Sequence, residues 1–182
     1  MLILNLGAGD NIIPGATNVD VMAWSGIDDV VDLTVLPWKW SNNSVDKIYM
    51  IHTLEHFENP KAILSECHRI LKVGGILEII VPHSSSIPAV GCLGHYRTFS
   101  HGTLDAYLCR EFYMFKTKKF ETISQEIMWW SGRPCHGVPT WILRSINYVV
   151  NRMIKLSPVA YENLWWPLTG GAREVRYVGR KV

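Results

Sequence analysis

The sequence has 182 residues, of which 48% are hydrophobic and 19% are charged, and its formal net charge is +2. This composition is typical of a single folded domain with a full hydrophobic core, slightly toward the apolar side of the globular range. The small net charge gives no electrostatic reason to expect a nucleic acid or an anionic membrane as a partner.

The N-terminal segment MLILNLGAGD has only four apolar residues before Asn5, too few for a signal peptide or a membrane span. The cysteines form no C-x-x-C pair, so neither a zinc finger nor a disulfide framework is expected. They are Cys67, Cys92, Cys109 and Cys135. We expect a cytoplasmic protein with reduced thiols and no stable membrane insertion. Composition does not separate a complete protein from a module of a longer chain.

Short apolar runs alternate with turn signals through the first half of the chain. Runs of this length between glycine-rich or polar loops are typical of buried strands in a parallel sheet. The predicted strands are LILNL (2–6), TNVDV (17–21), DVVDL (29–33), KIYMI (47–51) and ILEIIV (76–81). A helix is predicted over residues 60–72, with Pro60 at its first position and Gly74 as the residue that ends it.

The second half of the chain is less regular. Residues 118–128 and 172–182 have the alternation of strands, and about forty residues rich in tryptophan lie between them. A helical stripe runs through this segment, with further apolar residues beside it, so its apolar face is wide. The stripe is Ile142, Ile146, Val149 and Met153, flanked by Leu143, Val150 and Ile154. We expect one domain, 1–182, with a tryptophan-rich helical insertion at about 130–170.

Glycines, carboxylates and histidines directly follow the predicted strands. Ligands of open parallel sheets bind outside the carboxyl ends of the strands, so these residues are expected along one edge. They are Gly7-Ala8-Gly9, Asp20, Asp32, His52 and Pro82-His83. Glycines permit close approach of a ligand to the backbone, and a carboxylate can accept both hydrogen bonds of a ribose diol. The pattern therefore favours a nucleoside ligand.

The first glycine-rich turn does not suit a dinucleotide. It lacks the third glycine of G-x-G-x-x-G and places Asp10 where a diphosphate needs hydrogen-bond donors. Asp20 also follows Gly9 too closely for the usual helical crossover. The expected ligand therefore has no diphosphate.

Five segments in this order resemble the class I S-adenosylmethionine-dependent methyltransferases. They are LNLGAGD (4–10), GATNVDV (15–21), DLTVLPW (32–38), NNSVDKIYMIHTLEHF (42–57) and RILKVGGILEIIVPH (69–83). Beyond residue 83 the resemblance is thinner. HYRTFS (95–100) and EVRYVGRK (174–181) look like features of a subset often linked to polysaccharide biosynthesis.

The resemblance implies a fold, a cofactor and a binding site. The fold would be α/β, a single doubly wound Rossmann-like sheet of about seven strands, mostly parallel with an antiparallel C-terminal strand. The cofactor would be S-adenosyl-L-methionine, with its methionine and ribose along the glycine-rich turn, its ribose hydroxyls on Asp20 and its adenine beside Asp32. The residues implied for cofactor binding are Gly7, Ala8, Gly9, Asp20, Val21, Asp32, Leu33 and His52.

Residues 52–56, HTLEH, have the H-x-x-E-H spacing of certain zinc peptidases. A zinc peptidase needs both histidines inside a helix and a third ligand that converges on them. Here the motif directly follows a predicted strand, and no third ligand is evident in the sequence. We therefore expect no metal, and we expect Glu55 and His56 to cap or brace the following helix.

Three residues are candidates for chemistry on the acceptor. Methyl transfer to a hydroxyl calls for a base, and His83 is the candidate because imidazole titrates near neutrality. The alternative is a loop histidine that bonds a backbone carbonyl. His95 and Arg97 lie in an aperiodic stretch expected to cover the active edge, and Arg97 could anchor a phosphate or carboxylate of the acceptor. A structural salt bridge is the alternative for Arg97.

The tryptophan-rich segment contains Trp129, Trp130, Trp141, Trp165 and Trp166. Aromatic faces can stack on sugars or line a pocket, but packing in a core or a subunit interface is favoured. This region could form the contact between copies of the chain or with fused domains. With its basic residues, it could also contact the surface of a membrane.

The sequence predicts a methyltransferase that O-methylates a glycan or small-molecule hydroxyl. Glycan preference rests on the family resemblance alone. An amine or carboxylate metabolite is the alternative acceptor. A cofactor-binding subunit without activity is the alternative outside the enzymes, and no nucleic acid partner is expected.

Overall fold

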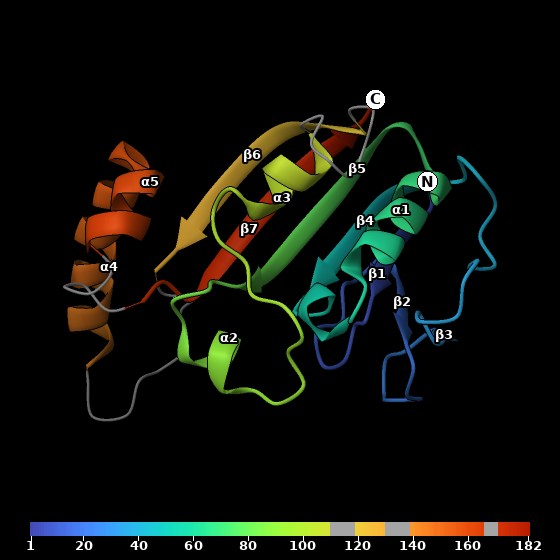
Figure 1. Ribbon diagram of the computed structural model, residues 1–182. Helices are drawn as coiled ribbons and strands as arrows, with labels where there is room; N and C mark the ends of the chain where they lie inside the picture. The colour runs from blue at the N-terminus through green and yellow to red at the C-terminus, as the bar shows by residue number, and fades with distance from the viewer. Residues whose placement is uncertain (110–118, 130–138, 166–170) are drawn as a thin grey trace.

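A computed structural model describes residues 1–109, 119–129, 139–165 and 171–182, which form a seven-stranded sheet in the order β3-β2-β1-β4-β5-β7-β6 (Figure 1). Strands β1 to β5 are parallel, and β7 lies antiparallel between β5 and β6. The strands are β1 (Ile3–Leu6), β2 (Thr17–Asp20), β3 (Asp29–Val30), β4 (Val45–Ile51), β5 (Leu71–Pro82), β6 (Phe120–Met128) and β7 (Glu174–Lys181). The predicted Rossmann-like fold class is confirmed.

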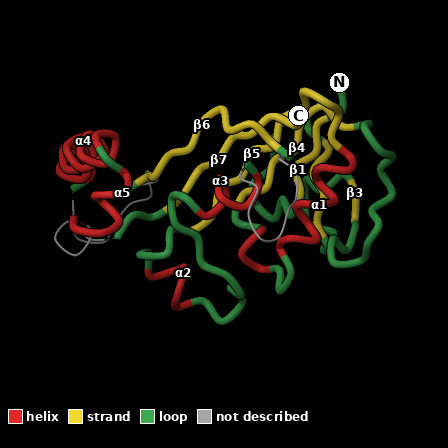
Figure 2. Tube along the Cα trace, turned by 45° about the horizontal axis from the view of Figure 1, so that its top comes forward, coloured by secondary structure: helices red, strands yellow, loops and turns green. Residues whose placement is uncertain are grey.

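The helices are α1 (Pro60–Ile70), α2 (Ile87–Gly91), α3 (Thr103–Leu108), α4 (Thr140–Leu156) and α5 (Pro158–Ala160), with short helical turns η1 (Leu54–His56) and η2 (Tyr161–Trp165). Both views show α1 and α3 on the same face of the sheet, while α4 and α5 lie beyond the end of β6 (Figures 1 and 2). Within the described ranges, the connections from β1 to β2 and from β2 to β3 contain no helix, so the opposite face has little helical cover. No described helix has both the length and the hydropathy that a membrane span requires.

Helix α1 begins as its sequence predicts but ends earlier. The Asn59 side chain accepts a hydrogen bond from the Ala62 amide, and Pro60 occupies the first turn. The helix ends at Ile70 because Leu71 is already extended and pairs with Val45. The prediction that Gly74 ends the helix is therefore wrong, since Gly74 lies within β5, where its φ is 80°.

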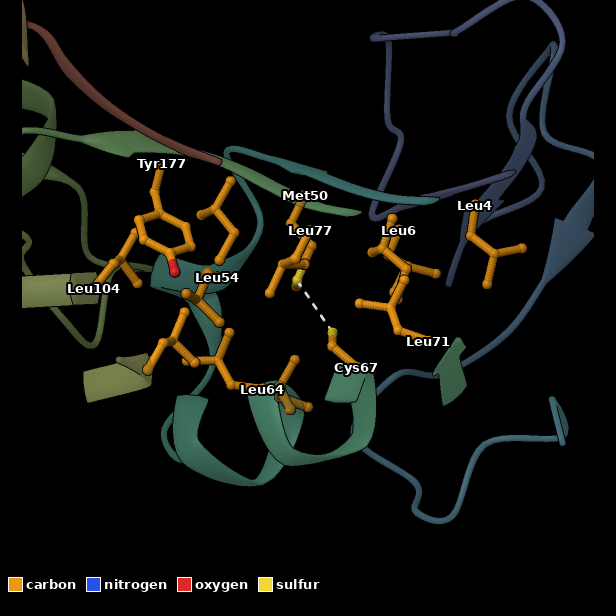
Figure 3. Packing of buried hydrophobic residues seen from close by; sticks show 14 of the residues in the cluster. Leu4, Leu6, Met50, Leu54, Leu64, Cys67, Leu71, Leu77, Leu104 and Tyr177 are labelled. Atoms are coloured by element: carbon orange, nitrogen blue, oxygen red, sulfur yellow. Dashed lines mark hydrogen bonds between the residues drawn. The ribbon is translucent and has the colours of Figure 1, made fainter. Parts of the chain in front are cut away.

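The main core lies between α1 and the sheet. Leu6, Met50 and Leu77 project from three strands onto Leu64 and Cys67 of the helix (Figure 3). The Cys67 Sγ lies 3.8 Å from the Met50 Sδ, and burial raises the pKa of the Cys67 thiol. Cys67 is therefore a structural cysteine in the core.

Helix α4 packs with one edge of its wide apolar face. Leu143, Val150 and Ile154 are buried, whereas Ile146 is 42% and Val149 56% exposed. The residues expected to flank the stripe therefore form the packed face. Trp129 contacts the small cluster that this face makes with β6.

Candidate cofactor and acceptor site

A cavity of about 500 Å³ lies at the carboxyl ends of the parallel strands. Its walls come from the turns after β1, β2, β3 and β4, which the sheet brings to one edge. The lining residues are Gly7, Gly9, Asp20, Val21, Val31, Asp32, Leu33, Thr34, His52, Thr53, His56 and Phe57. Of the residues expected to bind a cofactor, only Ala8 is absent from this lining, and Ala8 is buried behind it at 1% exposure.

The turn after β1 brings its backbone against the cavity. Gly7 has a φ of 69°, and a Cβ there would lie 2.2 Å from the Thr53 methyl carbon, so the position requires glycine. Gly9 has a φ of 48°, and a Cβ there would meet no atom within 4 Å. Gly9 therefore keeps cavity space open.

Asp20 fastens this turn to the end of β2. One carboxylate oxygen accepts a hydrogen bond from the Gly9 amide at 2.9 Å, and the other accepts one from the Met22 amide at 3.0 Å. A carboxylate has about four acceptor positions, so Asp20, which lines the cavity, keeps capacity for two hydroxyl donors.

Asp32 and Leu33 form the opposite wall. Asp32 accepts hydrogen bonds from the hydroxyl and the amide of Thr34, which hold the pKa of this carboxyl below its usual range. The Leu33 carbonyl accepts a hydrogen bond from the Trp38 indole at 3.0 Å. Both residues are thus held in place, which suits a wall that must present fixed edges to a flat ring.

His52 lines both this cavity and a second one. Its φ is 53°, and its ring lies 3.2 Å from Glu174 and 3.5 Å from Glu55. Interaction with Glu174 first and then with Glu55 raises the pKa of His52 to about 9, although burial opposes the shift. His52 is therefore a cation at neutral pH.

The second cavity has a volume of about 260 Å³ and shares His52 and His56 with the first. Its other polar walls include Glu55, His95 and Glu174. The loop expected to cover the active edge thus supplies His95, as predicted from its position. Two adjoining cavities of this kind can hold a cofactor and an acceptor side by side.

His83 is buried away from both cavities, whereas a general base must reach the acceptor. It is 1% exposed and is not among the residues that line either cavity. Its Nδ1 lies 2.7 Å from the Ser85 hydroxyl and its Nε2 lies 2.9 Å from Glu162, while burial lowers the pKa of the ring. The structure therefore shows His83 as a bridge between β5 and η2, and its role as base stays a prediction.

Arg97 lines a different cavity from His95. Its guanidinium donates to the carbonyls of Tyr96 and Glu58, and it borders a third cavity of about 310 Å³ beside α1. The structure therefore does not bring His95 and Arg97 together in one acceptor cavity, and a role for Arg97 in acceptor binding stays a prediction.

Asn59 caps α1, so the prediction that Glu55 and His56 cap the following helix is wrong, and the alternative that they brace it stays a prediction. Both belong to η1 and border the cavities. Sequence reasoning also missed Thr53, Phe57 and Thr34. The signal available was their position, since each stands one to six residues past the end of a predicted strand.

Residues 25–79 match the model of a family described as a methyltransferase domain. No curated protein matches the chain. Among solved structures, an S-adenosylmethionine-dependent methyltransferase from Archaeoglobus fulgidus matches with a TM-score of 0.62 at 15% identity. The match covers 98% of this chain and 85% of the chain of that methyltransferase.

Two further solved structures are of methyltransferases whose names give different acceptors. Geranyl diphosphate C-methyltransferase from Streptomyces coelicolor has a TM-score of 0.60 at 16% identity, with 100% of this chain and 72% of its own covered. Phosphoethanolamine N-methyltransferase 2 from Haemonchus contortus has a TM-score of 0.57 at 13% identity, with 100% and 48% covered.

At these identities the structural likeness establishes the fold and leaves the acceptor open. The chain has the fold found in these S-adenosylmethionine-dependent methyltransferases, and residues 25–79 match a methyltransferase domain.

Proposed function

We propose that this protein transfers a methyl group from S-adenosylmethionine, held in the 500 Å³ cavity, to an acceptor held in the adjoining cavity. The observation that carries the proposal is the convergence of Gly9, Asp20, Asp32 and His52 from four strand ends on one cavity. Four such residues gathered by four separate strands form a site shaped for a nucleoside.

Each residue has a role that follows from its position. Asp20 would accept the ribose hydroxyls, Gly7 and Gly9 would let the backbone approach the ligand, and Asp32 with Leu33 would border the adenine. The cofactor supplies an electrophilic methyl group. The protein contributes orientation and the exclusion of water, because methyl transfer is an in-line displacement.

A neutral hydroxyl is the acceptor that the second cavity favours. His52 and Arg173 contribute positive charge to its walls, while Glu55 and Glu174 contribute negative charge, so the wall charges balance. The side chains of these walls by themselves give no advantage to a carboxylate or an ammonium group. A sugar hydroxyl fits this chemistry, and the resemblance to polysaccharide-linked enzymes supports a glycan among the hydroxyl acceptors.

The test is cofactor binding by an Asp20→Ala variant. Loss of a charged acceptor for the ribose should weaken S-adenosylmethionine binding by about ten- to a hundredfold in isothermal titration calorimetry. Asp10→Ala is the matched control, since Asp10 is an exposed carboxylate on the same turn outside the cavity lining. Equal affinities for both variants and the natural protein would exclude this cavity as the cofactor site.

Turnover separates an enzyme from a binding subunit. An enzyme should release S-adenosylhomocysteine when it is offered a panel of sugar and small-molecule hydroxyl acceptors, with amine acceptors as a comparison. Binding without any product across the panel would favour the alternative, a cofactor-binding partner subunit.

A further inference from the structure

Three metal-binding side chains converge at the junction of the two cavities. Glu55 and His56 come from η1, and His95 comes from the loop after α2. One ligand atom from each lies within 4.8 Å of the other two. The sequence shows two members of this set at H-x-x-E-H spacing, and the structure supplies a third group that the sequence alone does not reveal.

Glu55 is the first observation that points to a ligand. Its side chain is 1% exposed, and neither carboxylate oxygen accepts a hydrogen bond from the part of the chain that the structure describes. The Nδ1 of His52 lies 3.5 Å from a Glu55 oxygen, beyond good hydrogen-bond geometry. A buried carboxylate with such incomplete bonding is costly, so a further positive charge at this place would stabilise the fold.

The two histidines have their ring nitrogens arranged for coordination. His56 Nδ1 lies 2.9 Å from the Gly94 carbonyl. A carbonyl only accepts, so this nitrogen carries the proton, and in the neutral ring Nε2 keeps a lone pair. Metal-binding histidines are commonly oriented by such a bond. His95 Nδ1 is buried without a hydrogen-bond partner among the described residues, and the two rings lie 4.8 Å apart between centroids.

We propose that Glu55, His56 and His95 bind a divalent first-row transition ion such as Zn²⁺, Co²⁺ or Mn²⁺. Two imidazoles and one carboxylate suit such ions, whereas Mg²⁺ prefers an all-oxygen site. Ligands about 2.1 Å from a tetrahedral ion stand about 3.4 Å apart, so the side chains close inward by roughly an ångström on binding. His56 is exposed, which leaves room for this movement and a route for the ion.

The site deepens the proposed function and, in its catalytic role, rests on it. An ion at this junction would hold the acceptor hydroxyl and lower the pKa of that hydroxyl. The hydroxyl proton passes to water, the oxygen forms a bond to the methyl carbon, and the carbon–sulfur bond breaks with its electron pair on sulfur. Glu55, His56 and His95 all line the acceptor cavity, so an acceptor held there could reach the ion.

The rival explanation is an ion pair without metal, in which protonated His52 alone compensates Glu55. Co²⁺ titration of untagged full-length protein, stripped with chelator, separates the two. We expect one equivalent of Co²⁺ to bind with visible absorption bands typical of nitrogen and oxygen ligands, Zn²⁺ to displace it, and Mg²⁺ to fail to displace it.

Variants locate the site. Glu55→Gln and His95→Asn should each weaken Co²⁺ binding by about tenfold or more, while the remote control His68→Asn binds as the natural protein does. His95 lies on a partly exposed loop, so its variant keeps the test valid if Glu55→Gln fails to fold. Absence of stoichiometric binding, or equal affinity in the His95 variant, would overturn the metal site. Calorimetry with S-adenosylmethionine alone tests the proposed function separately.

Discussion

Gly9 offers the cleanest residue-scale test of the cofactor cavity, because a matched glycine lies nearby. Gly9 and Gly15 both have positive φ, and a Cβ at either position would meet open space, but only Gly9 lines the cavity. An alanine at either position should cost about 1 kcal/mol of unfolding free energy from left-handed backbone strain. Only Gly9→Ala should also occupy volume that the cofactor needs.

We therefore expect similar urea midpoints for Gly9→Ala and Gly15→Ala but a loss of S-adenosylmethionine affinity of about tenfold or more in Gly9→Ala alone. Calorimetric titration of both variants gives this comparison. If Gly15→Ala weakened binding equally, strain passed along the loop would explain the effect, and the cavity assignment would lose this support.

At the scale of the elements, a charge network joins β4, β5 and β7. Glu78 accepts from Lys47 at 2.9 Å and from Arg176 at 2.7 and 2.9 Å. Burial acts to raise the pKa of Glu78, but the bonds from the two cations outweigh it and hold that pKa below the usual value. One buried carboxylate therefore joins three strands.

Glu78→Gln should lower the unfolding free energy by about 2 kcal/mol, because Lys47 and Arg176 then lose the carboxylate that bonds both of them. The control is Glu121→Gln on the edge strand β6, where the carboxylate is exposed and the change should stay within about 0.5 kcal/mol. Urea unfolding at pH 7 measures both. Equal midpoints for the two variants would show that the network contributes nothing to stability.

Local sequence patterns predict most of the strands but not how the elements meet. Apolar runs between turn signals predicted β1 to β5, and alternation predicted β6 and β7, because the strand period is a local property of the sequence. The position of Gly74 could not be predicted, since pairing of Leu71 with Val45 ended the helix early. The approach of His95 to Glu55 likewise depends on the path of an aperiodic loop.

At the scale of the whole molecule, His68 links helix α1 to the far edge of the sheet. Its ring meets Phe120 of β6 edge-on, with centroids 5.5 Å apart. Burial first, and then the positive charges of Lys181 and Lys119, lower the pKa of His68 to about 4. The fold therefore favours the neutral form of this ring.

This shift predicts an acid-sensitive stability. Above pH 6.5 the ring is neutral in both the folded and the unfolded chain, so its full contribution is present. As the pH falls from 6.5 toward 4, the unfolded chain gains a proton that the folded chain refuses, and stability is lost. The loss should reach about 1–3 kcal/mol, allowing for partial solvent screening of the ring.

His68→Gln removes the titrating group, so the variant should lose less stability than the natural protein between pH 6.5 and 5. Urea unfolding at several pH values gives the difference between the two curves. His52 does not imitate this effect, because its raised pKa places its own stability change between pH 6.5 and about 9. Parallel curves below pH 6.5 would mean that the ring accepts a proton within the fold, and that α1 and β6 separate enough to hydrate it.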